Sequence, residues 1–228
     1  MRYIDVLGAE FDNMDVEEAV ELSIRSMCER EGEYVLELDS QDVLKSRKSR
    51  RVASILSKSL LLLPADGGVY AAAGLLGTPL EHRMDPSDYT GALMARMSEM
   101  SMSAYILVSR PGIAQRASDD MAYRFPGIRV AGASDINDMD DEELINCINS
   151  HSPDLLVLSM DYMEQMGLIY GLWPKMDAGL CLGIGSAMDA YVTKRGESGF
   201  FRRLADDPAG TLKEARIILA ALKKRIFG

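Results

Sequence analysis

Short apolar runs alternate with longer amphipathic segments along most of this chain. The apolar runs predict strands at 3–7, 34–38, 60–63, 104–108, 128–131, 155–158 and 180–184. Apolar residues at helical spacing predict helices at 16–29, 41–57 (one helix or two), 69–76, 86–100, 113–123, 140–149 and 162–172. Strands and helices that alternate in this way predict an α/β fold, with a Rossmann-like, mostly parallel sheet and helices on both faces.

The third apolar run is followed directly by candidate catalytic and binding residues. Leu60–Leu63 is followed by Pro64, and then by Asp66, Gly67 and Gly68, before an alanine-rich helix. In open parallel sheets, ligands bind outside the carboxyl ends of the strands. Asp66 is therefore a candidate catalytic carboxylate beside glycines that allow close approach to the backbone. Aspartate is also common in turns, so an ordinary turn explains the same pattern.

The C-terminal segment has a different character from the rest. Its apolar residues fall on one helical stripe: Leu212, Ala215, Leu219, Leu222 and Ile226. Its basic residues are Lys213, Arg216, Lys223, Lys224 and Arg225. A basic amphipathic helix either lies on an anionic membrane surface or packs on the sheet or on a partner subunit. The prediction is an α/β domain over residues 1–195 and a basic helical appendage over 196–228.

Charge and composition exclude several classes of protein. The chain has 228 residues and a net charge of -10, which suits one globular domain and argues against general nucleic-acid binding. A local basic run from Lys45 to Arg51 indicates either a phosphate contact or a solvated helix face. Cys28, Cys147 and Cys181 form neither a disulfide framework nor a metal pattern, which favours a reducing, cytoplasmic location without a bound metal.

Several short motifs occur in an order that indicates a family. The chain opens with Ile4–Met14 and Glu17–Ala19, and Leu75–Met84 is followed by Ser87 and Asp88. Later blocks are Pro111–Ala114, Phe125–Ile128, Ser152–Leu156 and Gly183–Asp189. In this order they resemble segments of the WecG/TagA/CpsF family of bacterial glycosyltransferases, from Ile4 to about Asp189.

The resemblance implies an activity and its partners. It implies an inverting transferase that moves a sugar, often N-acetylmannosamine, from a UDP donor to a polyprenyl-diphosphate-linked acceptor in cell-envelope polysaccharide synthesis. It implies no cofactor and no metal. The basic C-terminal helix is then expected to bring a cytoplasmic protein to the inner membrane surface as a peripheral protein. Self-association into a homo-oligomer is left open.

The resemblance also assigns roles to residues. Asp66 or Glu37 is the expected general base, which must reach the proton of the acceptor hydroxyl. Arg83 is expected to contact the diphosphate, although a structural salt bridge to Asp85 or Asp88 is the alternative. Glu164 and Gln165 are expected to bind uridine or ribose hydroxyls, unless they only begin a helix. The expected substrate-binding residues are Asp39, Gly67, Gly68, Asp88, Glu164, Gln165, Gly183, Gly185 and Asp189.

The motifs that carry the chemistry depart from the family pattern. The family's T-x-N corresponds to Glu37-Leu38-Asp39, where carboxylates would repel a diphosphate. Its P-D-G-x-G-V corresponds without a gap to Pro64–Val69, which places Ala65 at the base position; a one-residue deletion restores the pair Asp66-Gly67. These departures support an alternative, a catalytically degenerate paralogue that acts as a binding or partner subunit. A further alternative is an unrelated Rossmann-type nucleotide binder.

Overall fold

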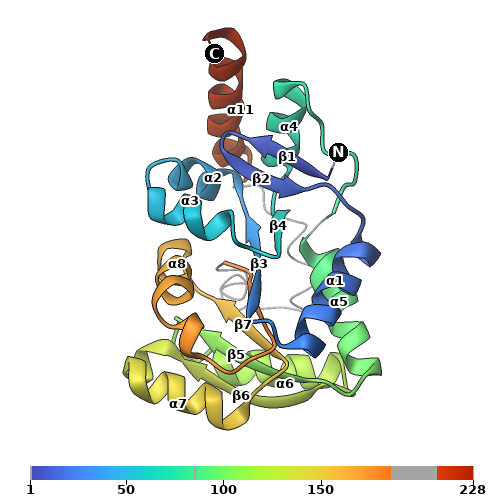
Figure 1. Cartoon of the computed structure of the whole chain (residues 1–228), viewed down its shortest axis with the longest axis vertical. Coiled ribbons are helices and arrows are strands. Elements are labelled where there is room, and N and C mark those ends of the chain that lie inside the picture. The colour runs from blue at the N-terminus through green and yellow to red at the C-terminus, as the bar shows by residue number, and fades with distance from the viewer. Residues whose placement is uncertain (1, 85, 186–209, 228) are drawn as a thin grey trace.

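A six-stranded, all-parallel sheet forms the centre of the protein (Figure 1). The structure is a computed structural model, and it describes residues 2–84, 86–185 and 210–227. The strand order is β4-β3-β8-β7-β5-β6. The strands are β3 (Glu33–Leu38), β4 (Leu61–Pro64), β5 (Ser103–Val108), β6 (Arg129–Asp135), β7 (Leu155–Ser159) and β8 (Leu180–Gly183). The predicted α/β fold is confirmed.

Helices cover both faces of the sheet because successive strand residues point to opposite sides. Leu36 and Leu38 lie in one apolar core, and Val35 lies in the other. The first core is covered by α2 (Ser40–Ser46), α3 (Arg50–Leu56), α4 (Gly67–Leu76), α7 (Asp141–His151), α8 (Tyr162–Gly171) and α11 (Gly210–Phe227). The second is covered by α1 (Val16–Glu29), α5 (Pro86–Glu99) and α6 (Ala114–Arg124). Short 3₁₀ helices, η1 and η2, occupy Ile136–Asp138 and Trp173–Lys175.

A small hairpin precedes the sheet, and its second strand was not predicted. β1 (Tyr3–Val6) pairs antiparallel with β2 (Ala9–Asp12). Leu7 and Gly8 both have positive φ (59° and 97°), as a two-residue hairpin turn requires. At the end of β2, Asp12 Oδ2 accepts a hydrogen bond of 2.9 Å from the backbone N–H of Leu62 in β4. The hairpin thus provides a hydrogen-bond acceptor for a backbone N–H of β4, the outermost strand of the main sheet.

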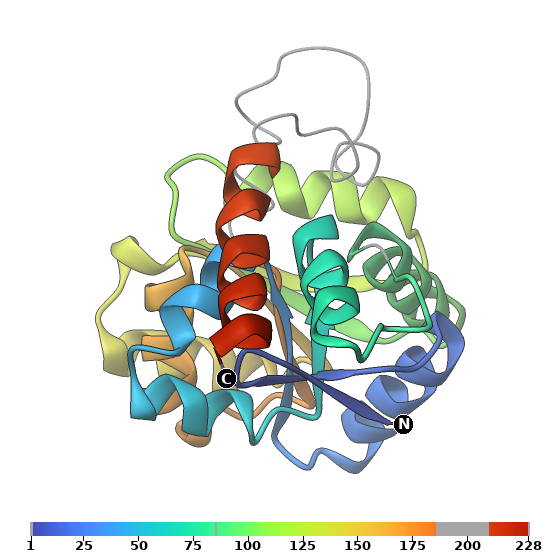
Figure 2. The same ribbon diagram turned by 90° about the horizontal axis from the view of Figure 1, so that it is seen from above.

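The C-terminal helix α11 packs against α4 and α2, so that elements from opposite ends of the chain lie side by side (Figures 1 and 2). Ile217 and Ala221 of α11 are fully buried in the first core. Arg225 Nη1 donates to the carbonyl of Leu75 at 3.0 Å, and Lys224 pairs with Asp5. The predicted helix is confirmed; its buried residues Ile217 and Ala221 lie outside the predicted apolar stripe, and Leu219 and Ile226 of that stripe are exposed.

Part of the predicted appendage lies outside the described residues. The expected boundary between residues 195 and 196 falls there, as does Asp189. Among the helices that the structure describes, none has both the length and the apolar content to cross a bilayer. The first core nevertheless includes α11, which means that this helix packs as part of the α/β body.

We predict that Ile217→Ala destabilises the protein more than Leu219→Ala. Ile217 is fully buried, whereas 58% of Leu219 is exposed. Truncating a buried isoleucine leaves a cavity and costs about 2–5 kcal/mol of unfolding free energy, whereas an exposed leucine costs about 0.5 kcal/mol or less. Urea denaturation of both variants measures the difference. Equal losses would contradict the packing of α11 through the Ile217 face.

Candidate active site

The carboxyl ends of four neighbouring strands gather most of the predicted site residues. In parallel strands these ends lie on one edge, and in the order β4-β3-β8-β7 they span about 14 Å at the usual strand spacing. Asp66 follows β4, Asp39 follows β3, Gly185 follows β8, and Glu164 lies just beyond β7. Since α4, α2 and α8 begin directly after these strands, their N-terminal ends lie at the same edge.

Asp66 is half-buried and joins the starts of two helices. It is the N-cap of α4, where Oδ1 accepts a hydrogen bond from Val69 N at 3.1 Å. Oδ1 also accepts from Ser40 Oγ at 2.7 Å, and Oδ2 accepts from Ser40 N at 3.0 Å. A carboxylate offers about four acceptor sites. Three are therefore occupied by the protein, and Oδ2 retains capacity for one more donor.

Asp39 serves as the N-cap of α2. Its Oδ1 accepts from Gln41 N and Asp42 N at 2.8 and 2.9 Å, where the helix dipole favours negative charge. Asp42 lies next to it and pairs with Lys45 at 2.9 Å. Burial, and then the charge of Asp39, raise the pKa of Asp42 to about 6, while Lys45 opposes this shift. The acidic cluster at the end of β3 is thus largely balanced by helix amides and one lysine.

Glu37 lies inside the protein, on the face of β3 that packs against α5. Only 6% of the residue is exposed. Its Oε1 accepts a hydrogen bond of 3.0 Å from Thr90 Oγ1 in α5. Burial raises the pKa of Glu37 to about 8, and the bond from Thr90 offsets this only in part. At neutral pH the side chain is therefore mainly the uncharged acid and does not add to the negative charge of the strand end.

Arg83 is exposed and lies beside the first turn of α4. Its guanidinium carbon is 5.9 Å from the centre of the Tyr70 ring. The Tyr70 hydroxyl holds the same loop, because it donates to Met84 O at 2.9 Å and accepts from Met84 N at 2.7 Å. Tyr70 lies one helical turn after Asp66, so the structure brings Arg83 to the same end of α4 as the carboxylate. Asp88, also exposed, lies in the first turn of α5.

Gln165 of α8 holds the end of β8 through a hydrogen bond. This side chain is 1% exposed, and its Oε1 accepts from Gly185 N at 3.2 Å. A Cβ on Gly183 would come within 2.3 Å of Gln165 Nε2, so any larger residue there would force Gln165 to move. Gly185 has φ of +57°, and its carbonyl accepts from Ser159 Oγ at 3.0 Å. Glu164, the neighbour of Gln165, is exposed.

The structure adds residues that sequence reasoning missed. Ser40, Thr90 and Ser159 hold Asp66, Glu37 and Gly185 in place. These partners are far apart in sequence, and a lone serine or threonine gives no signal of such a contact. Gly67 and Gly68 form the first turn of α4. Within the described part of the chain, no group of three or more His, Cys, Asp or Glu side chains could hold a metal ion.

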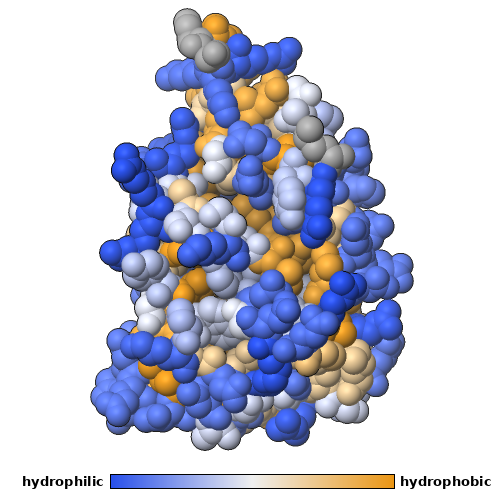
Figure 3. All heavy atoms as spheres, in the orientation of Figure 1, coloured by the Kyte–Doolittle hydropathy of each residue, from blue (hydrophilic) through white to orange (hydrophobic). Residues whose placement is uncertain are grey.

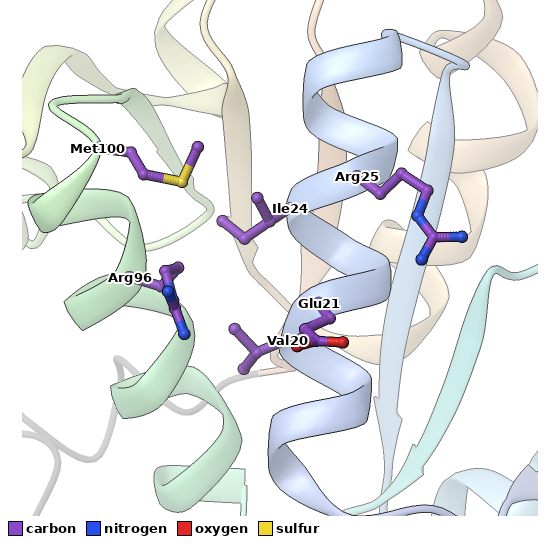
Figure 4. A pocket seen from close by; sticks show the side chains of 6 residues that line it. All are labelled: Val20, Glu21, Ile24, Arg25, Arg96 and Met100. Carbon is purple, nitrogen blue, oxygen red and sulfur yellow. The ribbon is translucent and has the colours of Figure 1, made fainter.

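A separate hollow of about 290 Å³ lies between α1 and α5 (Figure 4). It is lined by Val20, Glu21, Ile24, Arg25, Arg96 and Met100. The C-terminal ends of α1 and α5 lead to the starts of β3 and β5, Arg96 lies in the last turn of α5, and Met100 directly follows that helix. The hollow thus lies toward the amino edge of the sheet, and none of the predicted site residues lines it.

A parallel sheet with helix starts, glycines and carboxylates along one edge is typical of Rossmann-like α/β proteins, which bind their ligands at that edge. The sequence model of the Glycosyl transferase WecG/TagA/CpsF family matches residues 4–197. The chain belongs to this family.

Two relatives are similar over most of their length. One is the N-acetylglucosaminyldiphosphoundecaprenol N-acetyl-beta-D-mannosaminyltransferase of Bacillus spizizenii, 23% identical over 190 residues, which cover 79% of this chain and 74% of the relative. A Staphylococcus aureus protein of the same name is 19% identical over 205 residues, which cover 88% of this chain and 80% of the relative. The family expected from the motif order is confirmed.

We predict that Glu37→Gln flattens the pH dependence of stability. Burial raises the pKa of Glu37 from 4.5 to about 8, so between these values the folded protein holds a proton that the unfolded chain has lost. The free energy of unfolding therefore falls as pH rises through this interval. Glutamine keeps the acceptor for Thr90 and removes the titration.

Urea denaturation at pH 5, 6.5 and 8 measures the effect as the difference between wild type and Glu37→Gln. Asp12 and Asp42, whose pKa values burial also raises to about 6, are present in both proteins and cancel in the difference. A wild type that loses no more stability between pH 5 and 8 than the variant would show that Glu37 is not held as the acid.

Proposed function

We propose that this protein transfers an N-acetylmannosamine-type sugar from a UDP donor to a polyprenyl-diphosphate-linked acceptor. The proposal is carried by one observation: a chain that belongs to this family gathers Asp66, Asp39, Gly185 and Glu164 along one edge of its sheet. The names of the two relatives supply the sugar and the lipid-linked acceptor class. The UDP donor follows from the family resemblance.

Asp66 is proposed as the general base. A base must lie within hydrogen-bond reach of the proton that it removes. Asp66 Oδ2 accepts one hydrogen bond from the protein, from Ser40 N, and can accept another from a substrate hydroxyl. The bonds from Ser40 and Val69 hold the carboxylate in one orientation. Glu37 is less suited to direct contact because it is almost entirely buried, so its proposed role is to support the end of β3.

The diphosphate is proposed to lie near the first turn of α4. Arg83 would supply a guanidinium, whose fork of N–H donors suits phosphate oxygens. The N-terminal ends of α4 and α8 add partial positive charge, and the exposed Gly67 leaves the backbone of α4 open to a ligand, whereas Gly68 is buried. A cation and helix dipoles at the leaving group would stabilise the charge that develops there.

The nucleoside is proposed to lie across the ends of β3, β8 and β7. Asp39 and Asp88 flank this edge, Gly185 would let a ligand approach the backbone, and Glu164 would accept hydrogen bonds from ribose or uracil. Gly183 is buried and makes room for Gln165 rather than for a ligand. Gln165 would not contact the ligand directly; it would act as a positioning residue, through its hydrogen bond to Gly185. Asp189, the remaining expected contact, stays a prediction.

The membrane surface is proposed to be reached through α11, in a protein at the cytoplasmic face. Leu219 and Ile226 are 58% and 68% exposed, and Lys223, Lys224 and Arg225 are exposed beside them. Hydrophobic and hydrophilic side chains lie next to one another on the projecting end of this helix (Figure 3). Exposed apolar residues flanked by cations favour binding at an anionic membrane interface.

We predict that Asp66→Asn abolishes most turnover while UDP binding persists. Loss of a general base lowers the rate by about 10²–10⁴-fold. Calorimetry with UDP and an assay of UDP release in the presence of the lipid-linked acceptor measure binding and chemistry separately. Asparagine presents an N–H₂ group to one of the three protein donors, so a loss of about 1–3 kcal/mol in stability is also expected.

Asp140→Asn is the matched control. Asp140 caps α7 by accepting from Glu142 N and Glu143 N, and α7 follows β6 at the far end of the sheet. Its turnover should equal that of the wild type. A wild type that fails to bind UDP would contradict the transferase and favour the degenerate partner subunit. Equal turnover of wild type and Asp66→Asn would remove Asp66 from the catalytic role.

We predict that Leu219→Ser combined with Ile226→Ser weakens binding to phosphatidylglycerol vesicles at least fivefold without unfolding the protein. Both side chains are mostly exposed, so their replacement removes membrane contact and leaves the buried Ile217 face intact. Vesicle co-sedimentation measures the change. Tyr123→Ser, at an 86% exposed site on α6, is the control for loss of surface hydrophobicity. If Tyr123→Ser weakened vesicle binding as much as the double variant in α11, a specific role for α11 would be contradicted.

A further inference from the structure

A basic pocket lies between α2 and α11, apart from the predicted active-site residues. It is a hollow of about 590 Å³, lined by Gln41, Leu44, Lys45, Arg47, Lys48 and Arg216. Four of these six residues are cationic. Three of the four come from the basic run between Lys45 and Arg51, and Arg216 comes from the C-terminal helix. The fold thus adds a distant cation to a local cluster.

The cations of this pocket are poorly balanced within the protein. Lys45 pairs with Asp42 at 2.9 Å. Arg47, Lys48 and Arg216 are exposed, and none of them forms an ion pair with another residue that the structure describes. The chain as a whole carries a net charge of -10, so this concentration of positive charge runs against its overall balance. Such clusters raise the local concentration of anions.

Helix electrostatics explain only part of the cluster. Lys45, Arg47 and Lys48 lie at the C-terminal end of α2, where the helix dipole favours cations. This effect does not account for Arg216, which belongs to α11. Arginine guanidinium groups bind phosphate oxygens with two parallel hydrogen bonds, and lysine adds a point charge. Gln41 contributes a neutral amide, and Leu44 an apolar wall.

We propose that the pocket between α2 and α11 binds a phosphate-bearing anion through Arg47, Lys48 and Arg216. Asp39 and Asp66 meet α2 at its N-terminal end, whereas Arg47 and Lys48 directly follow its other end, about 10 Å away along a helix of seven residues. Arg216 lines the same pocket from α11. The pocket is therefore a second anion site, and it does not depend on the transfer reaction. Its ligand is either the headgroup of an anionic lipid or a soluble phosphate.

The surroundings of the pocket are compatible with a lipid headgroup as the bound phosphate. Leu219 and Lys223 follow Arg216 by three and seven positions, so they lie on the same side of α11. A headgroup phosphate held by Arg216 would then lie beside an exposed apolar side chain and another cation. A soluble phosphate would use the same three cations without these neighbours.

The test compares two double charge reversals. Lys48→Glu with Arg216→Glu changes the pocket. Lys58→Glu with Arg116→Glu makes the same change in net charge at exposed sites outside the pocket. Calorimetry with inorganic pyrophosphate at 150 mM salt measures soluble binding, because this salt concentration screens weak, long-range attraction. Co-sedimentation with phosphatidylglycerol and phosphatidylcholine vesicles measures lipid binding. Thermal unfolding confirms that both variants fold.

The expected result is at least a tenfold loss of binding in the pocket variant and less than a twofold change in the control. Loss of phosphatidylglycerol binding, together with displacement of vesicles by pyrophosphate, identifies the headgroup as the source. A pocket-dependent loss of pyrophosphate binding alone identifies a soluble phosphate. The proposal is overturned if the wild type binds neither ligand, or if the two double variants lose binding equally. UDP binding is measured in parallel, so that failure at this pocket is distinguished from failure of the transferase.

Discussion

The junction between Asp66 and Ser40 is the constraint on which the site and the C-terminal helix both depend. Because β3 and β4 are parallel neighbours, the loops that follow them leave the sheet together. Asp66 then holds the first residue of α2 while it caps α4. Since α11 packs across both of these helices, their relative position also sets where the basic side chains of α11 lie. The carboxylate of Asp66, the candidate base, therefore links the starts of α4 and α2, the two helices on which α11 packs.

The acidic appearance of this edge is reduced by the fold. In sequence, Glu37, Asp39 and Asp66 suggest a surface that repels a diphosphate. In the structure, Asp39 and Asp66 accept backbone N–H groups at helix starts, and Glu37 is buried as a neutral acid beside Thr90. The departures from the family motif thus change the hydrogen bonds that hold the ends of β3 and β4 more than they change the net charge of this edge. This is why the geometry remains compatible with an anionic donor.

Much of the fold could be predicted because its signals are local. Apolar runs such as Leu60–Leu63 identify buried strands, and cap residues such as Asp15 mark helix starts. β2 was missed because it is a four-residue strand that gains its stability from β1 and β4. The buried face of α11 could not be predicted, because a helix with apolar residues on two sides does not reveal which side meets α4. Motif order supplied the candidate site residues, but the hydrogen bonds of Ser40 and Thr90 depend on tertiary contacts.

The central claim is that the carboxyl ends of β4, β3, β8 and β7 form one nucleotide site, in which Asp66 is the general base. A crystal structure of the protein bound to UDP tests it most directly. The account predicts the diphosphate near Arg83 and the first turn of α4, with the uridine beside Gly185 and Glu164. UDP bound at the opposite edge of the sheet, or in the hollow between α1 and α5, would contradict it.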